Sequence, residues 1–204
     1  MQGYILHTNK VKDEDLIVTI LTKTQVYTTY RFYGARHSTI NIGFKIDFEL
    51  ETTKNDIKRL KDIIQLGYPW ILNRNKLYLW QQYLKLFYNH LKDVDTIDSF
   101  YFDLLDDLAH RLTRQNSKRA IIENYIKLCK YEGRLEEHFT CILCELPIKD
   151  SISLIRAFKP VHSKCTYGKN IELKKIEKLF IEDNSIALDD TECEYLWNIL
   201  MQGL

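Results

Sequence analysis

The stretch Ile40-Asn-Ile-Gly-Phe-Lys-Ile-Asp-Phe-Glu-Leu-Glu51 alternates apolar and polar residues without interruption. A period of two places every apolar side chain on one sheet face, so the stretch predicts a half-buried β-strand. The preceding residues, 25–38, are rich in β-branched and aromatic side chains and predict a strand that bends at Gly34. Upstream, residues 3–8 and 15–22 predict two strands joined by a polar turn. Several short strands without an intervening helix predict a small closed barrel.

The chain after the barrel has the spacing of helices. Residues 54–66 carry apolar side chains three and four apart, which predicts a first helix, and Gly67 and Pro69 then mark a boundary. Further helices are predicted within 76–92, 96–113, 117–131 and, twice, 170–204, with links short enough for antiparallel packing. The predicted fold class is therefore α+β, with a barrel domain over 1–70 and a helical bundle domain over 71–204.

Length and composition bound the class of protein. The 204 residues allow a substantial core. Because the formal net charge is only +1, the protein as a whole does not attract a polyanion, and any basic surface must be local. Five cysteines are an odd number, which favours reduced thiols over a disulfide framework. The N-terminus has no basic segment of a signal peptide, and apolar runs are shorter than the roughly 18 residues of a membrane span. We expect a cytoplasmic protein.

Two short motifs predict a metal site. Cys141-Ile-Leu-Cys144 is followed by His162-Ser-Lys-Cys165, and two ligand pairs with two residues between the members of each are typical of a closed tetrahedral zinc site. We therefore predict structural Zn²⁺ held by a segment covering about 139–167. The alternative is a set of ordinary loop thiols and a surface histidine. The two remaining cysteines lie in helical patterns and are predicted to be buried thiols: Cys129 and Cys193.

The predicted strands also carry uncompensated cations. No carboxylate occurs between Leu16 and Ile46, whereas basic and aromatic side chains alternate there. Such a surface is typical of single-stranded nucleic-acid binding, and the alternative is a solvated basic strand pair over an aromatic core. If Tyr30 and Phe32 face the core, Arg31 and Tyr33 face outward, and we favour that arrangement because it exposes the arginine. The candidate DNA-binding residues are Lys23, Arg31, Tyr33, Arg36, His37 and Lys45.

Charge is segregated in the helical region. Residues 92–109 are acidic, whereas residues 111–134 are basic. The two segments either solvate each other or present a basic patch for DNA or an acidic peptide. The sequence shows no phosphate-binding glycine loop and no nucleophile–base pair, so we expect no enzymatic activity. The candidates for the patch are Arg111, Arg114, Lys118 and Arg119.

The order of these motifs resembles the RecO family of bacterial recombination mediators. The resemblance is carried by Gly3-Tyr-Ile-Leu6, by the acidic turn Glu14-Asp15 before a strand ending in Thr22, and by Arg31-Phe-Tyr-Gly-Ala-Arg36. It implies an N-terminal OB-fold and a C-terminal helical domain, which in some members carries a zinc-binding insertion. This sequence differs in being short and in having His162 within its metal quartet.

The resemblance also implies a function in the repair of DNA damage. Similar proteins bind single- and double-stranded DNA, anneal complementary strands, engage the acidic C-terminal tail of single-strand DNA-binding protein (SSB), and act with RecR to load RecA. It implies a cytoplasmic, nucleoid-associated location, and Arg111, Arg114, Lys118 and Arg119 become candidates for binding DNA or the SSB tail. Two alternatives stay open. One is a protein-interaction adaptor that does not bind DNA, and the other is an RNA-binding factor that recognises the 2′-hydroxyl.

Overall fold

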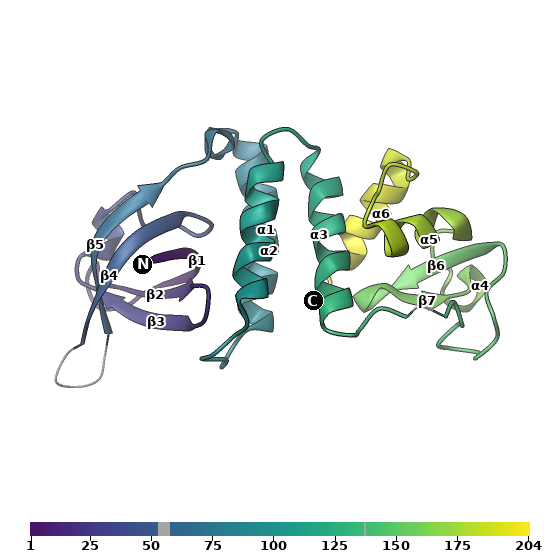
Figure 1. Ribbon diagram of the computed structural model, residues 1–204, viewed down its shortest axis with the longest axis horizontal. Coiled ribbons are helices and arrows are strands. Elements are labelled where there is room, and N and C mark those ends of the chain that lie inside the picture. Colours follow the sequence, from purple (N-terminus) through teal and green to yellow (C-terminus); the bar gives the residue numbers. More distant parts are fainter. Residues whose placement is uncertain (53–57, 137) are drawn as a thin grey trace. The chain divides into compact units, whose positions relative to one another are not determined.

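Five strands close into a barrel in the N-terminal part of the chain (Figure 1). The computed structural model describes residues 1–52, 58–136 and 138–204. The strands follow the order β1-β2-β3-β5-β4, and all neighbours are antiparallel except β3 and β5. Their bounds are β1 Gln2–Lys10, β2 Leu16–Leu21, β3 Val26–Arg31, β4 Lys45–Thr52 and β5 Lys58–Leu66. The predicted barrel is confirmed.

The alternating stretch 40–51 supplies the barrel core, as predicted. Ile46 and Phe48 on β4 are fully buried, and Ile40 and Phe44 are buried in the segment that leads into the strand. The strand begins at Lys45 because the chain turns at Gly43, whose φ is +89°. A Cβ atom at that glycine would lie 2.7 Å from the Trp80 ring, so only glycine fits this turn.

The helix predicted over 54–66 is wrong, because these residues form a strand. Residues 54–57 lie outside the described residues, and 58–66 form β5, paired with β4. Between Lys61 and Ile64 the register shifts by one residue, with Asp62 in the left-handed conformation (φ 47°). This β-bulge lengthens the apolar spacing from two residues to three, which imitates the period of a helix.

Two helices follow the barrel in the same compact unit, which spans Met1–Thr113. They are α1, Arg74–His90, and α2, Ser99–Arg111, and the short 3₁₀ helix η2, Pro69–Leu72, precedes them. Trp80 of α1 is fully buried, and its indole Nε1 donates to the Gly43 carbonyl at 2.9 Å. The predicted boundary at residue 70 lies inside this unit, and the division into domains 1–70 and 71–204 stays a prediction.

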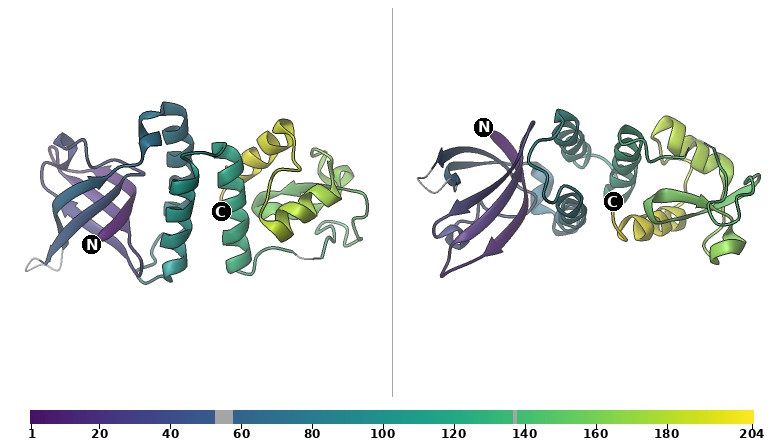
Figure 2. Two further views of the ribbon diagram at one scale, coloured as in Figure 1. Left: turned by 45° about the horizontal axis from the view of Figure 1, so that its top comes forward. Right: turned by 90° about the horizontal axis from the view of Figure 1, so that it is seen from below.

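The second compact unit, Arg114–Leu204, combines helices with a small sheet. Its helices are α3 Ser117–Tyr131, α5 Leu173–Glu182 and α6 Asp190–Leu200, and the sheet has the order β7-β6-β8 (Figures 1 and 2). Its strands are β6 Ser151–Ile155, β7 Lys159–Val161 and β8 Ile171–Glu172, with α4 Ser163–Thr166 between the last two. Helices α5 and α6 contact β6 of this sheet, and α3 contacts both helices. The sequence predicted the helices and missed this sheet, because its strands are too short to show a period.

Candidate nucleic-acid interface and candidate metal centre

Aromatic rings and cations lie against one another along β3 and the start of β5, with Phe32 and Arg59 exposed and Tyr27, Tyr30 and Lys58 half-buried. Phe32 is 46% exposed, and the Arg59 guanidinium lies 4.9 Å from its ring centroid. The Tyr30 ring stands edge-on to Phe32 at 4.9 Å, and the Lys58 ammonium lies 4.3 Å from the Tyr27 ring. The register that pairs Tyr30 with Arg59 brings the two strands together. We call these five residues the β3 ladder: Tyr27, Tyr30, Phe32, Lys58 and Arg59.

A groove of about 600 Å³ follows the same strand. Most of its lining comes from β3 and the residue before it, and Ile17 of β2 and Lys58 of β5 also contribute. The ladder therefore has an adjoining hollow, with one carboxylate, Asp95, on its wall.

The favoured orientation of β3 is wrong. Arg31 is half-buried and lies on the same side of the strand as buried Thr29, and its Nη1 donates to the Leu60 carbonyl at 2.8 Å. Phe32, expected in the core, is exposed, whereas Tyr33 is exposed as expected. Alternation does not extend past the end of β3 at Arg31, because Tyr33 adopts a left-handed backbone conformation with φ 50°.

The acidic turn before β2 holds the turn after β3. The Asp15 carboxylate accepts hydrogen bonds from the Tyr30 hydroxyl and from the Tyr33 backbone N–H, and these two bonds lower the pKa of Asp15. Glu14 pairs with Arg36, whose guanidinium lies 5.0 Å from the Tyr33 ring. The Glu14-Asp15 and Gly34-Ala35-Arg36 motifs are thus in direct contact, with the latter forming the 3₁₀ helix η1.

The other predicted cations of the barrel differ in how accessible they are. Lys23 is exposed and lies 3.8 Å from Asp103, and His37 is exposed in the turn after η1. Lys45 has only 12% of its side chain exposed and pairs with Asp106 at 2.5 Å. Their assignment to DNA binding stays a prediction, and burial makes Lys45 the least accessible of the three.

Lys45 belongs to a polar cluster between the barrel and α2. The Tyr4 and Tyr68 hydroxyls lie 2.8 Å apart, and both donate to Asp106, at 2.7 and 3.0 Å. Burial and these bonds raise the pKa of Tyr4, and burial raises the pKa of Tyr68 to about 12. Burial opposes ionisation of Asp106, but hydrogen bonds from Lys45 and Tyr4 lower the pKa of this carboxyl below its ordinary value.

We expect this cluster to make the free energy of unfolding fall in alkali. Unfolded tyrosines ionise near pH 10, whereas folded Tyr68 keeps its proton up to about pH 12. The stabilisation is fully present below pH 10 and is lost as pH rises toward 12, by up to about 1.4 kcal/mol per pH unit for each tyrosine. Urea unfolding between pH 8 and 11 measures the slope. Tyr68→Phe should flatten it and Tyr78→Phe, on an exposed ring, should not; equal slopes in all three proteins would contradict this assignment.

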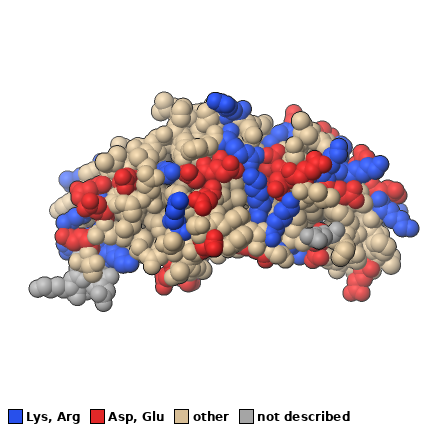
Figure 3. Space-filling model, viewed as in Figure 1, with Lys and Arg blue, Asp and Glu red and all other residues tan. Residues whose placement is uncertain are grey.

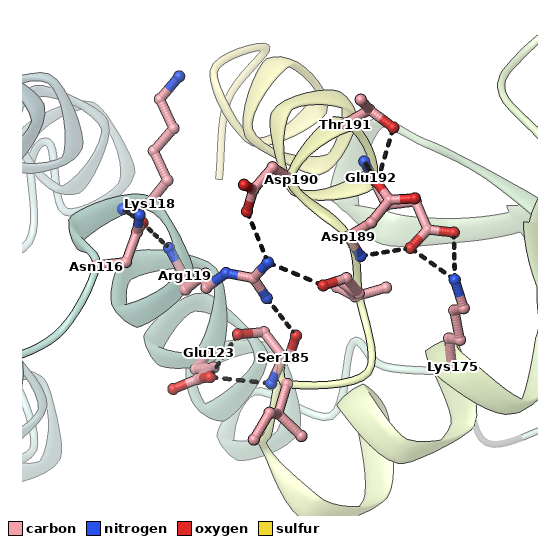
Figure 4. Close-up of polar contacts among 12 residues, drawn as sticks. Asn116, Lys118, Arg119, Glu123, Lys175, Ser185, Asp189, Asp190, Thr191 and Glu192 are labelled. Atoms are coloured by element: carbon pink, nitrogen blue, oxygen red, sulfur yellow. Dashed lines mark hydrogen bonds and ion pairs between the residues drawn. The ribbon is translucent and has the colours of Figure 1, made fainter.

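The predicted basic patch on the helices is largely engaged in contacts within each unit. Arg119 donates to the carbonyls of Ser185 and Leu188 at 2.7 and 2.8 Å and pairs with Asp190 at 2.9 Å (Figure 4). Lys118 pairs with Glu194 of α6, whereas Arg111 lies 3.8 Å from Asp107 and Arg114 is exposed. On the face in Figure 3, Lys and Arg are interspersed with Asp and Glu. A role of these residues toward DNA or an SSB tail stays a prediction.

The four predicted metal ligands come together in the second unit. The ligand atoms of Cys141, Cys144, His162 and Cys165 all lie within 4.8 Å of one another. The Cys144 Sγ lies 3.3 Å from the His162 Nδ1, and the His162 backbone N–H donates to the Cys141 Sγ at 3.3 Å. One pair sits in a tight turn closed by a Glu145 N–H to Cys141 carbonyl bond of 2.8 Å, and the other sits at α4.

The thiols have unequal acidity. Burial of Cys141 opposes its ionisation, but backbone N–H donors at His162, Leu143 and Cys144 outweigh burial and lower the pKa of Cys141 to about 6. Burial and neighbouring thiols raise the pKa of Cys165 to about 11. Three sulfurs and one imidazole nitrogen at this spacing fit a soft, tetrahedrally coordinated divalent cation, so the cluster could hold a metal ion. Cys129 and Cys193 are buried thiols, as predicted.

Sequence reasoning missed the two cations that lie against the β3 rings, Lys58 and Arg59. It placed them in a helix that the structure replaces by β5. The signal that could have found them is the apolar Leu60 between the charged residues Arg59 and Lys61, an alternation typical of a strand that holds up to the bulge at Asp62.

The barrel order β1-β2-β3-β5-β4 defines an OB-like barrel, a class in which strand faces bind oligonucleotides and oligosaccharides. Residues 1–71 match the family model described as RecO N terminal, so this barrel is RecO-like. The match covers all five strands and ends in η2. Curated proteins give no match to the chain. Within the described residues, every helix is too short or too polar to cross a membrane.

Proposed function

We propose that this protein binds single- and double-stranded DNA through its barrel and acts as a recombination mediator in DNA repair. The β3 ladder is the observation that carries the proposal, because an exposed ring, Phe32, beside half-buried tyrosines and two cations suits stacked bases and their phosphates. The RecO-like character of residues 1–71 supports the same function. We also propose that RecR, the SSB tail and, through them, RecA are its partners, at a cytoplasmic, nucleoid-associated location.

Annealing of complementary strands requires no catalytic group, and we propose that the protein is not an enzyme. Lys58 and Arg59 would screen phosphate charge, so that two strands approach each other at lower electrostatic cost. Stacking on Phe32 and Tyr27 would hold bases unpaired and exposed to the complementary strand. The groove along β3 would accept the backbone.

We propose that the metal is Zn²⁺ and that its role is structural. Cys141, Cys144, His162 and Cys165 would hold it, and the ion would fix the tight turn against α4. Four protein ligands leave no open coordination position, which separates this arrangement from a catalytic zinc site.

Substitution of the exposed ring tests the proposal. Phe32→Ala should lower affinity for single-stranded DNA by about five- to 150-fold, the range for losing one stacked base. Fluorescence anisotropy of a labelled oligodeoxythymidine measures this, and Tyr78→Ala, a 60% exposed ring on α1, is the matched control. If Phe32→Ala and Tyr78→Ala bind like the native protein, DNA does not stack on the ladder. Equal or tighter binding of an oligoribonucleotide would favour an RNA-binding factor instead.

A further inference from the structure

Tyr167, beside the metal cluster, is the most exposed large hydrophobic side chain that the described structure shows. It is 98% exposed and follows α4, the helix that carries Cys165. Its backbone is left-handed, with φ 54°. An aromatic residue in this conformation is strained, and such strain persists only where the surrounding structure imposes it. The fold therefore keeps the backbone of Tyr167 in a strained conformation at the end of α4, with its ring in solvent.

The next residue shows what imposes the strain. A Cβ atom at Gly168 would lie 2.2 Å from the Ser153 Oγ and 2.8 Å from the Tyr195 hydroxyl, so the backbone here packs directly against β6 and α6. Those two hydroxyls are themselves hydrogen-bonded at 2.8 Å. The chain is fixed immediately after Tyr167, and the ring is presented outward on a rigid support.

The sequence of the loops around the ring is rich in basic residues and partly apolar, and one of its cations, Lys159, pairs with Glu136 at 2.8 Å. Residues 138–170 contain five cations against two carboxylates. Since the metal-ligand atoms converge within 4.8 Å, the turn bearing exposed Ile142 and Leu143 flanks the same cluster as Tyr167. A fully exposed ring among excess cations complements an anionic partner that carries flat rings. The charged residues are Lys149, Arg156, Lys159, Lys164 and Lys169, against Glu145 and Asp150.

We propose that Tyr167 and the cations around it, Lys164 above all, form a second contact for single-stranded nucleic acid, in which one base stacks on the Tyr167 ring. The contact belongs to the metal-bearing loops and shares its ligand with the proposed function of the barrel. It does not use any residue of the β3 ladder. The excess of cations favours a nucleic acid over a protein partner, although Ile142 and Leu143 are apolar.

Three substitutions of one residue in the full chain separate stacking from a structural role. Tyr167→Ala should lower single-strand affinity at least about fivefold, the lower end for one stacked base, and Tyr167→Phe should retain it. Tyr167→Gly should raise Tm, because glycine accepts φ 54°, and should still bind as weakly as the alanine variant. Native affinity in the glycine variant would overturn the proposal.

Photo-crosslinking distinguishes this contact from the barrel. An oligonucleotide with iodouracil at each position in turn is irradiated with the full chain, and crosslinked peptides are identified by mass spectrometry. We expect a crosslink at Tyr167 in the native protein and also in Phe32→Ala. Loss of all crosslinks in Phe32→Ala would place the ligand on the barrel alone, and crosslinks only on the barrel would overturn the second contact while leaving the proposed function intact.

Discussion

Replacement of Cys141 by serine is expected to abolish stable metal binding and to unfold the loops between residues 139 and 167. The buried Cys141 thiol receives N–H donors from three backbone groups and belongs to a quartet whose ligand atoms lie within 4.8 Å. Structural zinc sites contribute on the order of 10 kcal/mol of binding free energy, which exceeds what short strands such as β7 and β8 supply. Elemental analysis should find one equivalent of zinc in the native chain and little in the variant, whose Tm should fall.

His138→Ala provides the matched control. This exposed imidazole lies one residue before that segment and outside the quartet, so its loss should leave metal content and Tm unchanged. A chelator added to the native protein should reproduce the effect of Cys141→Ser. If the native chain contains no metal and Cys141→Ser melts at the native temperature, the four residues are ordinary loop thiols and a histidine.

Removal of the Asp106 carboxylate is expected to lower the free energy of unfolding of the first unit strongly. Lys45 would keep its charge with 12% of its side chain exposed and without its partner, and the Tyr4 and Tyr68 hydroxyls would lose their acceptor. Breaking a buried ion pair costs roughly 3–5 kcal/mol. Because Asp106 is 30% exposed, we expect a loss at the lower end of this range, about 3 kcal/mol. Urea unfolding of Asp106→Ala measures it.

Two further variants show whether the cost arises from the unpaired lysine. Lys45→Met/Asp106→Leu removes both charges and should recover much of the stability. Asp103→Ala, on the exposed side of α2, should change it by less than about 0.5 kcal/mol. A loss of about 3 kcal/mol in the double variant as well would show that the tyrosine hydroxyls, and not the lysine charge, account for the effect.

The parts of the fold that could be predicted are those whose pattern is local. The alternation through Phe44, Ile46 and Phe48 survives in the structure because one side of the barrel wall is buried. The metal quartet was found from spacing alone because two ligands separated by two residues fit one tight turn. Both signals are contained within a few residues and do not depend on tertiary packing.

The errors arose where one residue changes the geometry of a strand. The bulge at Asp62 gave β5 a helical period, which concealed Lys58 and Arg59, and the left-handed Tyr33 ended the alternation that placed Arg31 outside. The ion pair of Lys45 with Asp106 joins residues 61 positions apart, so no local pattern could show that this cation is occupied. The candidate DNA surface consequently moves from Arg31 and Lys45 to the β3 ladder.

The salt dependence of single-stranded DNA binding tests whether DNA binds to the β3 ladder. Anisotropy titrations across a salt series should show tight binding at low salt, and Lys58→Gln/Arg59→Gln should flatten the logarithmic slope by about 0.7 for each phosphate that the variant no longer neutralises. Lys85→Gln, an exposed cation on α1 outside the ladder, should leave the slope unchanged. Absence of binding at low salt would contradict DNA binding and favour an adaptor that binds only proteins. A slope unaffected by removal of both ladder cations would contradict the ladder as the DNA site.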